Sequence, residues 1–360
     1  MAVMRSRCVG LTITAFVATA VLFTGCAVNE QGDAESDLAG TLDGAGSSAQ
    51  GAAQDAWIAG FQRANASVTV NYDPAGSGAG REQFIVGAVG YAGSDAALSI
   101  EETRGPLARC AEDSGAINLP VYLSPIVLAF NIDGVDRLQL DAAAVAGIFS
   151  GEIERWNDPE LVSLNPDVAL PDGRITPVHR SDDSGTTENF TDYLAEAAPE
   201  RWPFEADGVF PVEGEAAQGN SGVSAVIRDG VNVIGYLDAS RAEGLNVANL
   251  AVGDSFVEPS ADSAAAIVDV SPIEPGRDDG DLVVDIDRAT AESGVYPLVL
   301  VSYLIACREY TDPREGELVR AYLEWVASPE GQDAAAADAG SAPISDTVRE
   351  QVLAAVAGIG

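Results

Sequence analysis

The sequence predicts an α/β protein with two domains, and three observations lead to this prediction. Apolar runs of strand length alternate with helical patterns along the chain, which favours α/β lobes whose largely parallel sheets are covered on both faces. Once an N-terminal targeting segment is set aside, about 320 residues remain, a length typical of two domains. The 360-residue chain is 47% apolar, so its acidity does not indicate disorder.

The individual elements follow from the spacing of the apolar residues. Strands are expected where short apolar, β-branched runs are bounded by turn residues, at 68–72, 116–121, 126–132, 175–178 and 231–237. Helices are expected where apolar residues recur every three or four positions, at 49–64, 81–89, 142–149, 186–197 and 317–327. In the first of these helices the apolar side consists of Ala53, Trp57 and Phe61.

Residues 1–25 are expected to be a lipoprotein signal peptide and not part of the fold. Two arginines precede an apolar stretch at 9–23, which is short for a transmembrane helix. The stretch ends in Thr24-Gly25-Cys26, which resembles a bacterial lipobox, so we expect a lipid anchor on Cys26. The alternative is a plain secretory signal whose cysteine is incidental. The small, acidic residues 26–37 are expected to form a flexible tether.

The remaining cysteines bear on the compartment and on metal binding. Export would leave Cys110 and Cys307, an even pair that forms either a disulfide in an oxidising compartment or two buried free thiols. His179 is the single histidine and the cysteines contain no CxxC pair, so multi-histidine metal sites, zinc ribbons and thioredoxin-type chemistry are excluded. We therefore expect no metal site.

The charge excludes whole classes of partner. The chain has 56 acidic residues against 19 basic ones, all of them arginine, for a net charge of −37. Such a surface repels phosphate backbones, so the chain is not a general nucleic-acid binder. Basic attachment to anionic lipid is excluded for the same reason, which leaves the lipid anchor as the expected membrane contact.

Three short turns indicate where an anion could bind. Each is rich in glycine or small hydroxyl residues and precedes a predicted helix, at 44–49, 76–80 and 182–187. Free backbone N–H groups, hydroxyls and the positive end of a helix dipole then meet at one point, which is the composition of an anion site. A single turn of this kind is usually a simple helix cap, but three of them beside an arginine favour an oxyanion.

Arg180 and Asp95 add a charged donor and an acceptor to these turns. The guanidinium of Arg180 fits two oxygens of a tetrahedral oxyanion, and Asp182 could hold it in one orientation. In isolation the two could equally form an ordinary surface ion pair. The carboxylate of Asp95 can accept the O–H of hydrogenphosphate, whereas sulfate at neutral pH has no proton to offer. The alternative for Asp95 is a turn residue or helix N-cap.

These motifs carry a family resemblance. The chain resembles the periplasmic-type phosphate-binding proteins of the PstS family, the substrate-binding lipoproteins of phosphate ABC importers, from about Leu38 to Ala355. The most specific block begins at Leu140-Asp141 and includes 148–153, Trp156-Asn157-Asp158-Pro159, 164–166 and 179–191. Further agreement lies at 219–223, 234–236, 256–260 and 296–298.

The resemblance implies a fold of the type II periplasmic-binding-protein class. Two α/β lobes with central mixed sheets would be joined by a two-strand hinge, and the ligand would lie in the cleft between them. Lobe I is expected from 38–123 plus 294–360, and lobe II from 124–293. The crossovers would lie near 122–125 and 294–297, and closure about them would bury the ion.

The resemblance also implies a set of phosphate-binding residues and no cofactor. Donors are expected from three turns, and the proton acceptor and the arginine from two more positions: Ser48, Ala49, Ser77, Gly78, Asp95, Arg180, Ser184, Gly185 and Thr186, with Asp182 orienting the arginine. Two positions depart from the family pattern. Gly78 stands where a second serine is common, and Ser48 replaces a frequent threonine.

The expected function is high-affinity binding of inorganic phosphate outside the cytoplasm by a monomer, and delivery to ABC permease subunits. One alternative is a receptor of the same fold for sulfate, molybdate or tungstate. Another is a phosphate-binding surface protein with a signalling role. A serine hydrolase is disfavoured, because no G-x-S-x-G elbow surrounds Ser184 and His179 is the one available histidine base. We therefore expect no enzyme activity.

Overall fold

The computed structural model describes residues 38–360, apart from the side chains of Asp269 and Val270. The predicted signal peptide, the tether and Cys26 lie outside the described residues. Within residues 38–360 the strands form a nine-stranded sheet, with the order β2-β1-β3-β12-β4-β8-β6-β7 and β9 paired to β4, and a three-stranded sheet β11-β10-β5.

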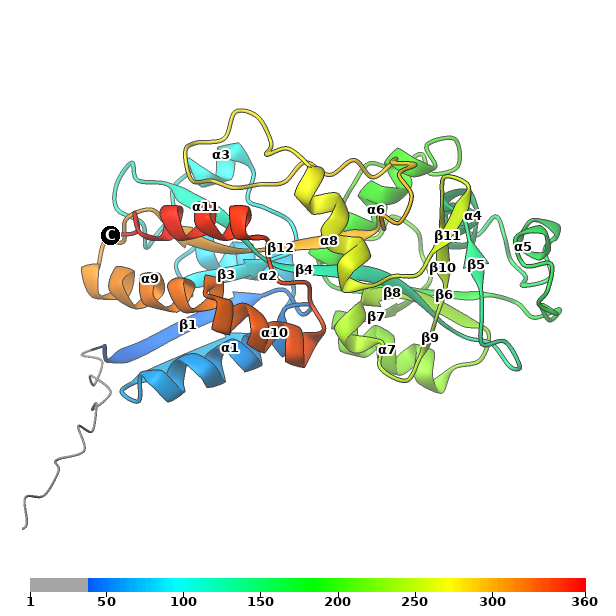
Figure 1. Cartoon of the computed structure of the whole chain (residues 1–360), viewed down its shortest axis with the longest axis horizontal. Coiled ribbons are helices and arrows are strands. Elements are labelled where there is room, and N and C mark those ends of the chain that lie inside the picture. Colours follow the sequence, from blue (N-terminus) through cyan, green and yellow to red (C-terminus); the bar gives the residue numbers. More distant parts are fainter. Residues whose placement is uncertain (1–37) are drawn as a thin grey trace, which may run out of the picture. The chain divides into compact units, whose positions relative to one another are not determined.

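The elements alternate along the chain as the sequence predicts (Figure 1). The strands are β1 (Gly40–Gly46), β2 (Val68–Asp73), β3 (Tyr91–Ser94), β4 (Ala116–Asn131), β5 (Gln139–Leu140), β6 (Thr176–Arg180), β7 (Glu215–Ala217), β8 (Val233–Asp238), β9 (Asn246–Val247), β10 (Asn249–Val252), β11 (Ser255–Val257) and β12 (Val299–Cys307). The helices are α1 (Gly51–Ala64), α2 (Ser77–Ile85), α3 (Ile100–Thr103), α4 (Ala142–Ser150), α5 (Pro159–Leu164), α6 (Gly185–Ala197), α7 (Gly219–Asp229), the 3-10 turn η1 (Ala239–Arg241), α8 (Ala261–Val270), α9 (Pro313–Ala327), α10 (Pro329–Ala339) and α11 (Asp346–Val356).

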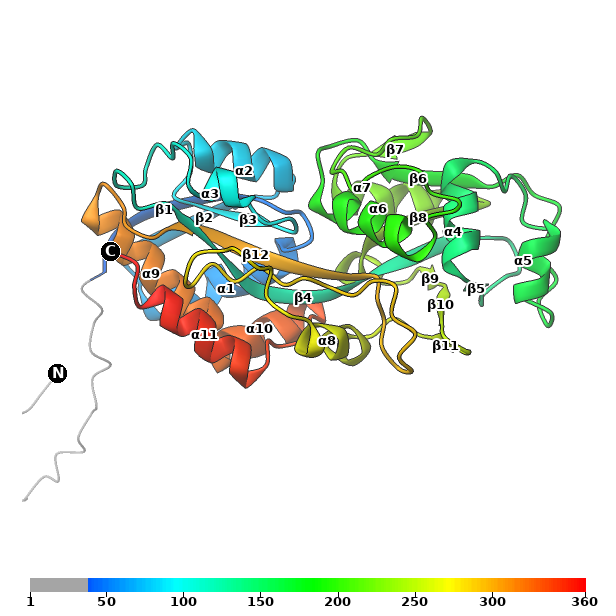
Figure 2. The same cartoon turned by 90° about the horizontal axis from the view of Figure 1, so that it is seen from above.

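One strand is shared by the two halves of the large sheet. The first part of β4 pairs with β12 as far as Pro125, and the rest, from Ile126, pairs with β8. Figure 2 shows β4 and β12 running from the half around β1, β2 and β3, here called the first lobe, towards the half around β6, β7 and β8, here called the second lobe. The change of partner occurs at a proline because proline has no N–H to donate to a ladder.

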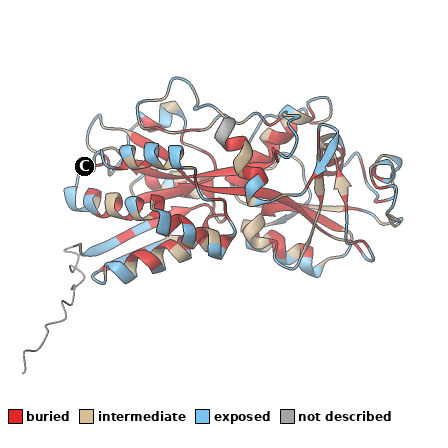
Figure 3. Ribbon diagram, viewed as in Figure 1, coloured by how far each residue is buried: buried red, intermediate tan, exposed pale blue. Residues whose placement is uncertain are grey.

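Both halves of the sheet are mixed, as expected. In the first lobe β1 is parallel to β2 and β3, and β12 is antiparallel to β3. In the second lobe β6 is parallel to β7 and β8, and β8 is antiparallel to β4. The strands are the most deeply buried part of the fold, with helices on both faces (Figure 3). This arrangement confirms the predicted α/β class with mixed sheets.

Several predicted elements differ from the structure in their bounds, and two cases have a clear reason. The strands expected at 116–121 and 126–132 are one continuous strand, because 15 of the 16 residues of β4 are buried and the two prolines interrupt the apolar pattern without ending it. The helix expected at 81–89 is α2, which begins four residues earlier at Ser77. Its first turn consists of the glycine-rich residues that suggested a turn, and Gly76 enables the sharp entry with a φ of 113°.

The segment after α8 contacts both lobes: Arg288 bonds Asp192 and Asn189 of α6, while an earlier part of the segment contacts the first lobe. Asp281 accepts hydrogen bonds from the backbone N–H and the side chain of Asn118 on β4, at 2.8 and 2.7 Å. Asp278 forms a bidentate ion pair with Arg104. This segment therefore contacts the first lobe as well as the second, and the assignment of 124–293 to lobe II stays a prediction.

The predicted disulfide is present. Cys110 and Cys307 are joined across 197 residues of sequence, and both lie in the first lobe. The free-thiol alternative is therefore wrong for this structure.

Within residues 38–360, none of the helices combines the length and the apolar character needed to cross a membrane.

Candidate functional site

The predicted site residues lie where strands of the two lobes end. Ser48 follows β1, Ser77 follows β2 and Asp95 follows β3, while Arg180 is the last residue of β6. The carboxyl ends of parallel strands meet at one edge of a sheet, and ligands of open α/β sheets bind in the crevice outside those ends. The sequence therefore places these residues at two facing sheet edges.

Asp95 is the buried carboxylate at the centre of this group and is 3% exposed. Its Oδ1 accepts a hydrogen bond from the Ser302 hydroxyl at 2.6 Å, and its Oδ2 accepts one from the Thr186 hydroxyl at 3.0 Å. Its backbone N–H donates to Ser77 Oγ at 3.1 Å. Burial raises the pKa of Asp95, and the hydroxyl bonds together with the charge of Arg180 oppose this effect.

Arg180 is the buried cation of the site and is 2% exposed. Its Nε and Nη2 donate to the two carboxylate oxygens of Asp182 at 2.9 and 2.5 Å, while Nη1 lies 3.3 Å from Thr186 Oγ1. The amide of Gly219, at the start of α7, also donates to Asp182 Oδ1. Burial acts to raise the pKa of Asp182, but the bonds to Arg180 outweigh it and lower that pKa overall. Asp182 therefore stays ionised and fixes the orientation of the guanidinium.

Ser48 reaches the second lobe through Asn220. Its hydroxyl oxygen accepts bonds from the backbone N–H and from Nδ2 of Asn220, at 3.2 and 3.0 Å. Asn220 is fully buried, and its Nδ2 also lies 3.4 Å from Thr186 Oγ1. The start of α7 is thus a fourth helix start, which lies beside Thr186 of α6 and contacts Ser48 of the first lobe.

The two lobes approach each other closely at Gly185. A Cβ placed on this residue would lie 2.7 Å from Asp95 Cβ and 2.7 Å from Ser77 Oγ. Its amide and that of Thr186 belong to the first turn of α6, where a helix offers no carbonyl partner. Glycine is therefore required for the first turn of α6 to approach the opposite loops.

Some of the predicted backbone donors are already bonded within the protein. The Ala49 amide donates to Ser47 Oγ at 3.0 Å, and the Gly78 amide donates to the Asp183 carbonyl across the lobes at 3.2 Å. The amide of Ser184 donates to the Gly208 carbonyl, and its hydroxyl oxygen accepts from the Thr187 amide as a helix N-cap. The predicted roles of Ala49 and Gly78 as ligand donors are therefore not supported by this geometry, because the same N–H groups stabilise a turn and the lobe contact.

Sequence reasoning missed several residues at the site. Asn220 lies within the 219–223 block that carried the resemblance, so a signal for it existed. Ser302 lies inside the apolar run of β12, where nothing in the sequence marks it. Ser47 is fully buried beside Ser48, and its hydroxyl is among the groups that lower the pKa of Asp95.

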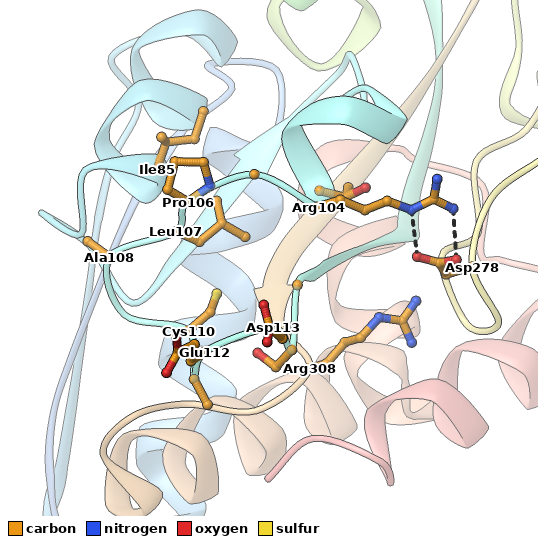
Figure 4. Close-up of a pocket in the computed structure, with 15 residues that line it drawn as sticks. Ile85, Arg104, Pro106, Leu107, Ala108, Cys110, Glu112, Asp113, Asp278 and Arg308 are labelled. Atoms are coloured by element: carbon orange, nitrogen blue, oxygen red, sulfur yellow. Dashed lines mark hydrogen bonds and ion pairs between the residues drawn. The ribbon is translucent and has the colours of Figure 1, made fainter.

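A separate cavity of about 530 Å³ lies in the first lobe beside the disulfide. Figure 4 shows Arg104 bonded to Asp278 in its wall and Arg308 next to this pair. Nη1 of Arg308 donates to the Asp279 carbonyl at 2.6 Å. The cavity walls do not include the predicted site residues, so we do not assign the anion site here.

Comparisons with known proteins agree with the fold and with the family resemblance. A family model described as a PBP superfamily domain matches residues 31–330. The chain is 36% identical over 341 residues to the phosphate-binding protein PstS3 of Mycobacterium bovis, a match that covers 92% of this chain and 90% of the relative. It is 34% identical over 359 residues to phosphate-binding protein PstS 3 of Mycobacterium leprae, covering 94% and 95% of the two chains.

A solved structure shows the same fold at lower sequence identity. A high-affinity periplasmic phosphate-binding protein, PfluDING, solved with bound phosphate, superposes with a TM-score of 0.69 and 22% identity. The alignment covers 88% of this chain and 93% of that one.

Proposed function

The chain belongs to the PBP superfamily and, within it, to the PstS-type phosphate-binding proteins, and we propose that it captures inorganic phosphate outside the cytoplasm for import by an ABC transporter. Its relatives are binding proteins by name, and binding without turnover is the function proposed here.

The observation that carries the proposal is the buried Asp95 beside a buried, oriented Arg180. Arg180 supplies a fork of donors for the oxygens of a tetrahedral anion. Asp95 supplies an acceptor, which an anion satisfies when it carries a proton. Hydrogenphosphate and dihydrogenphosphate do so at neutral pH and sulfate does not, so this pair of groups favours phosphate.

The donors we assign to the ion come from facing elements of the two lobes. They are the hydroxyls of Ser48, Ser77 and Ser184, the guanidinium of Arg180, and the first-turn amides of Gly185 and Thr186. These groups have the hydrogen-bonding character that a dehydrated phosphate requires.

The geometry supports binding over hydrolysis. His179 Nδ1 lies 2.8 Å from the Arg180 carbonyl, so the ring nitrogen donates there, and the ring stacks on Phe210 at 4.6 Å. Ser184 uses its oxygen as the N-cap of α6. The histidine is therefore held by backbone and aromatic contacts and not as the base of a nucleophilic serine.

We further propose that the protein is a monomer anchored through a lipidated Cys26 and that the permease subunits of the importer are its partners. Mass analysis of the mature protein tests the anchor, because acylation adds a defined mass at Cys26. An unmodified cysteine in protein recovered from membranes would contradict it.

Calorimetric titration with phosphate, sulfate and molybdate tests the ligand. We expect tight binding of phosphate and weak or no binding of the other two. Arg180→Ala should weaken phosphate binding by at least about 2 kcal/mol, since it removes a charge-assisted pair. Asp95→Asn should weaken the rejection of sulfate. Tight sulfate binding by the unaltered protein without phosphate binding would refute the proposal.

A further inference from the structure

A row of buried polar side chains runs from Asp95 into the first lobe. The hydroxyls of Tyr91 and Tyr322 contact Gln54 Oε1 at 3.2 and 2.8 Å. Gln54 Nε2 donates to Gln50 Oε1 at 2.9 Å, and Gln50 Nε2 donates to Ser302 Oγ at 2.7 Å. Ser302 Oγ then donates to Asp95 Oδ1 at 2.6 Å. We call the side chains that lead to Asp95 the donor chain: Tyr91, Tyr322, Gln54, Gln50 and Ser302.

The direction of every bond in the donor chain is fixed by chemistry. The amide of Gln50 also lies 2.9 Å from the backbone carbonyl of Tyr303, which accepts only, so the atom that faces Ser302 is the NH₂ group. The Ser302 oxygen is then an acceptor from Gln50, and its single proton points to Asp95. At the far end, two phenols face one amide oxygen of Gln54 and must both donate to it.

All members of the donor chain are 0% exposed, so their polar groups have lost their hydrogen bonds to water. A buried polar group without a hydrogen-bond partner costs several kcal/mol, so each member must be satisfied by the next. Apolar side chains would fill the same core without that requirement. The donor chain ends on Asp95, a buried carboxylate of the first lobe at the oxyanion site.

We propose that Ser302, oriented by Gln50, is a specificity-determining residue that keeps Asp95 a hydrogen-bond acceptor, so that the site takes protonated oxyanions and rejects sulfate. This inference rests on the proposed function and deepens it. Ser302 acts through Asp95 and is therefore a positioning residue. Ser302 lies on β12, which is one of the two strands that join the lobes. Its hydrogen bond therefore attaches the Asp95 carboxylate to a strand that both lobes share.

The electrostatics of Asp95 agree with this role. Burial raises its pKa, and among the opposing groups the Ser302 hydroxyl has the largest effect, ahead of Ser47, Thr186 and the charge of Arg180. The charge of Asp95 in turn helps to raise the pKa of Tyr72 on β2 and of Asp238 on β8. A hollow beside Asp95 also contains the acids Glu188, Asp192, Glu196, Glu274 and Asp285 and the bases Arg277 and Arg288. A change at Ser302 leaves all these charges in place.

The test is the pH dependence of binding in Ser302→Ala. Calorimetric phosphate titrations from pH 5.5 to 8.5 should show about a tenfold loss of affinity at neutral pH, the order expected for one hydrogen bond to a charged group. The acid limb of the affinity profile should move up by about one pH unit, because one unit corresponds to the same factor of ten. Sulfate should compete with phosphate near pH 6 in the variant and not in the unaltered protein.

Three further proteins make the result decisive. Ser302→Thr keeps the hydroxyl and should restore the original profile. Gln50→Met leaves Ser302 in place but removes its orienting donor, so it should shift the profile in the same direction. Ser224→Ala is the matched control. Ser224 is a buried serine on α7 whose hydroxyl donates to the Arg241 carbonyl at 2.7 Å and is not hydrogen-bonded to Asp95. It should leave the profile unchanged.

A loss of affinity that is equal at every pH, with sulfate still rejected, would overturn the specificity role of Ser302. If Ser302→Ala does not fold, an unshifted profile in Gln50→Met overturns it equally. Absence of phosphate binding by the unaltered protein is a different result, because it refutes the proposed function itself and the inference with it.

Discussion

Asp238→Asn should make the protein more stable at neutral pH. Asp238 ends β8 and is fully buried. Its Oδ1 accepts bonds from the Tyr122 hydroxyl at 3.0 Å and from the Ser240 amide at 2.9 Å, whereas its Oδ2 is buried without a hydrogen-bond partner. An asparagine keeps the acceptor Oδ1 and replaces the unpartnered charged oxygen with a neutral NH₂ group.

The size and the sign of the effect follow from the pKa of Asp238. Burial raises it from 3.8 to about 6, although hydrogen bonding to Ser240 opposes the change. The folded protein therefore binds this proton more tightly than the unfolded chain does. The resulting stability is fully present below about pH 4 and is lost as the pH rises through 6, a loss of about 1–3 kcal/mol. The asparagine variant avoids that loss.

Urea denaturation of both proteins at several pH values from 4 to 8 measures the difference. The free energy of unfolding of the variant minus that of the unaltered protein should rise by about 1–3 kcal/mol as the pH increases from 4 to 8. Asp254→Asn, at an exposed aspartate, is the control and should give no pH-dependent difference. If the difference for Asp238→Asn is the same at every pH, the carboxylate does not titrate as described and the reasoning fails.

Three further predictions concern the crosslink and the site. Reduction of Cys110–Cys307 should lower the free energy of unfolding by about 3–5 kcal/mol in urea titrations, and phosphate affinity should stay unchanged because both cysteines lie in the first lobe; a large loss of affinity would contradict this. Gly185→Ala would place its Cβ 2.7 Å from two atoms of the opposite lobe, so calorimetry should show at least about a tenfold loss of phosphate affinity. The control is Gly222→Ala, whose Cβ would lie 3.4 Å from its nearest neighbour, and this variant should bind phosphate normally. Arg180→Lys keeps the charge but loses the planar fork, so affinity should fall by about 2 kcal/mol, and unchanged binding would show that the fork is not used.

The sequence predicts the elements of this fold well where the apolar period is clear. Helices such as α1, α6 and α9 follow from regular apolar spacing, since each has one buried face. The predicted ends of an element are wrong where a residue such as proline or glycine is compatible both with a turn and with a continued strand or helix. Two strands are expected within β4, yet it is one strand that changes its partner at Pro125 and tolerates the proline there.

The sequence predicts those site residues that carry a charge and lie in a recognisable local motif. Arg180, Asp182 and Asp95 occur next to turns whose composition suggests anion binding, and the structure places them together. Ser302 and Gln50 could not be found in this way, because each lies in an unremarkable local sequence and acts across about 250 residues of chain. The same holds for the amides of Ala49 and Gly78, whose availability depends on bonds formed by the folded protein.

The shared strands also determine the order in which the molecule can be completed. The first lobe is built from both ends of the chain, since Trp57 of α1 donates to the carbonyl of Gly331 of α10, and β12 fills the position between β3 and β4. In a chain that emerges N-terminus first, the apolar face of α1 stays uncovered and Cys110 has no disulfide partner until the last quarter of the sequence arrives. The strands β6, β7 and β8 of the second lobe lie close together in sequence and can assemble earlier. The first lobe is therefore the half of the molecule that is completed last.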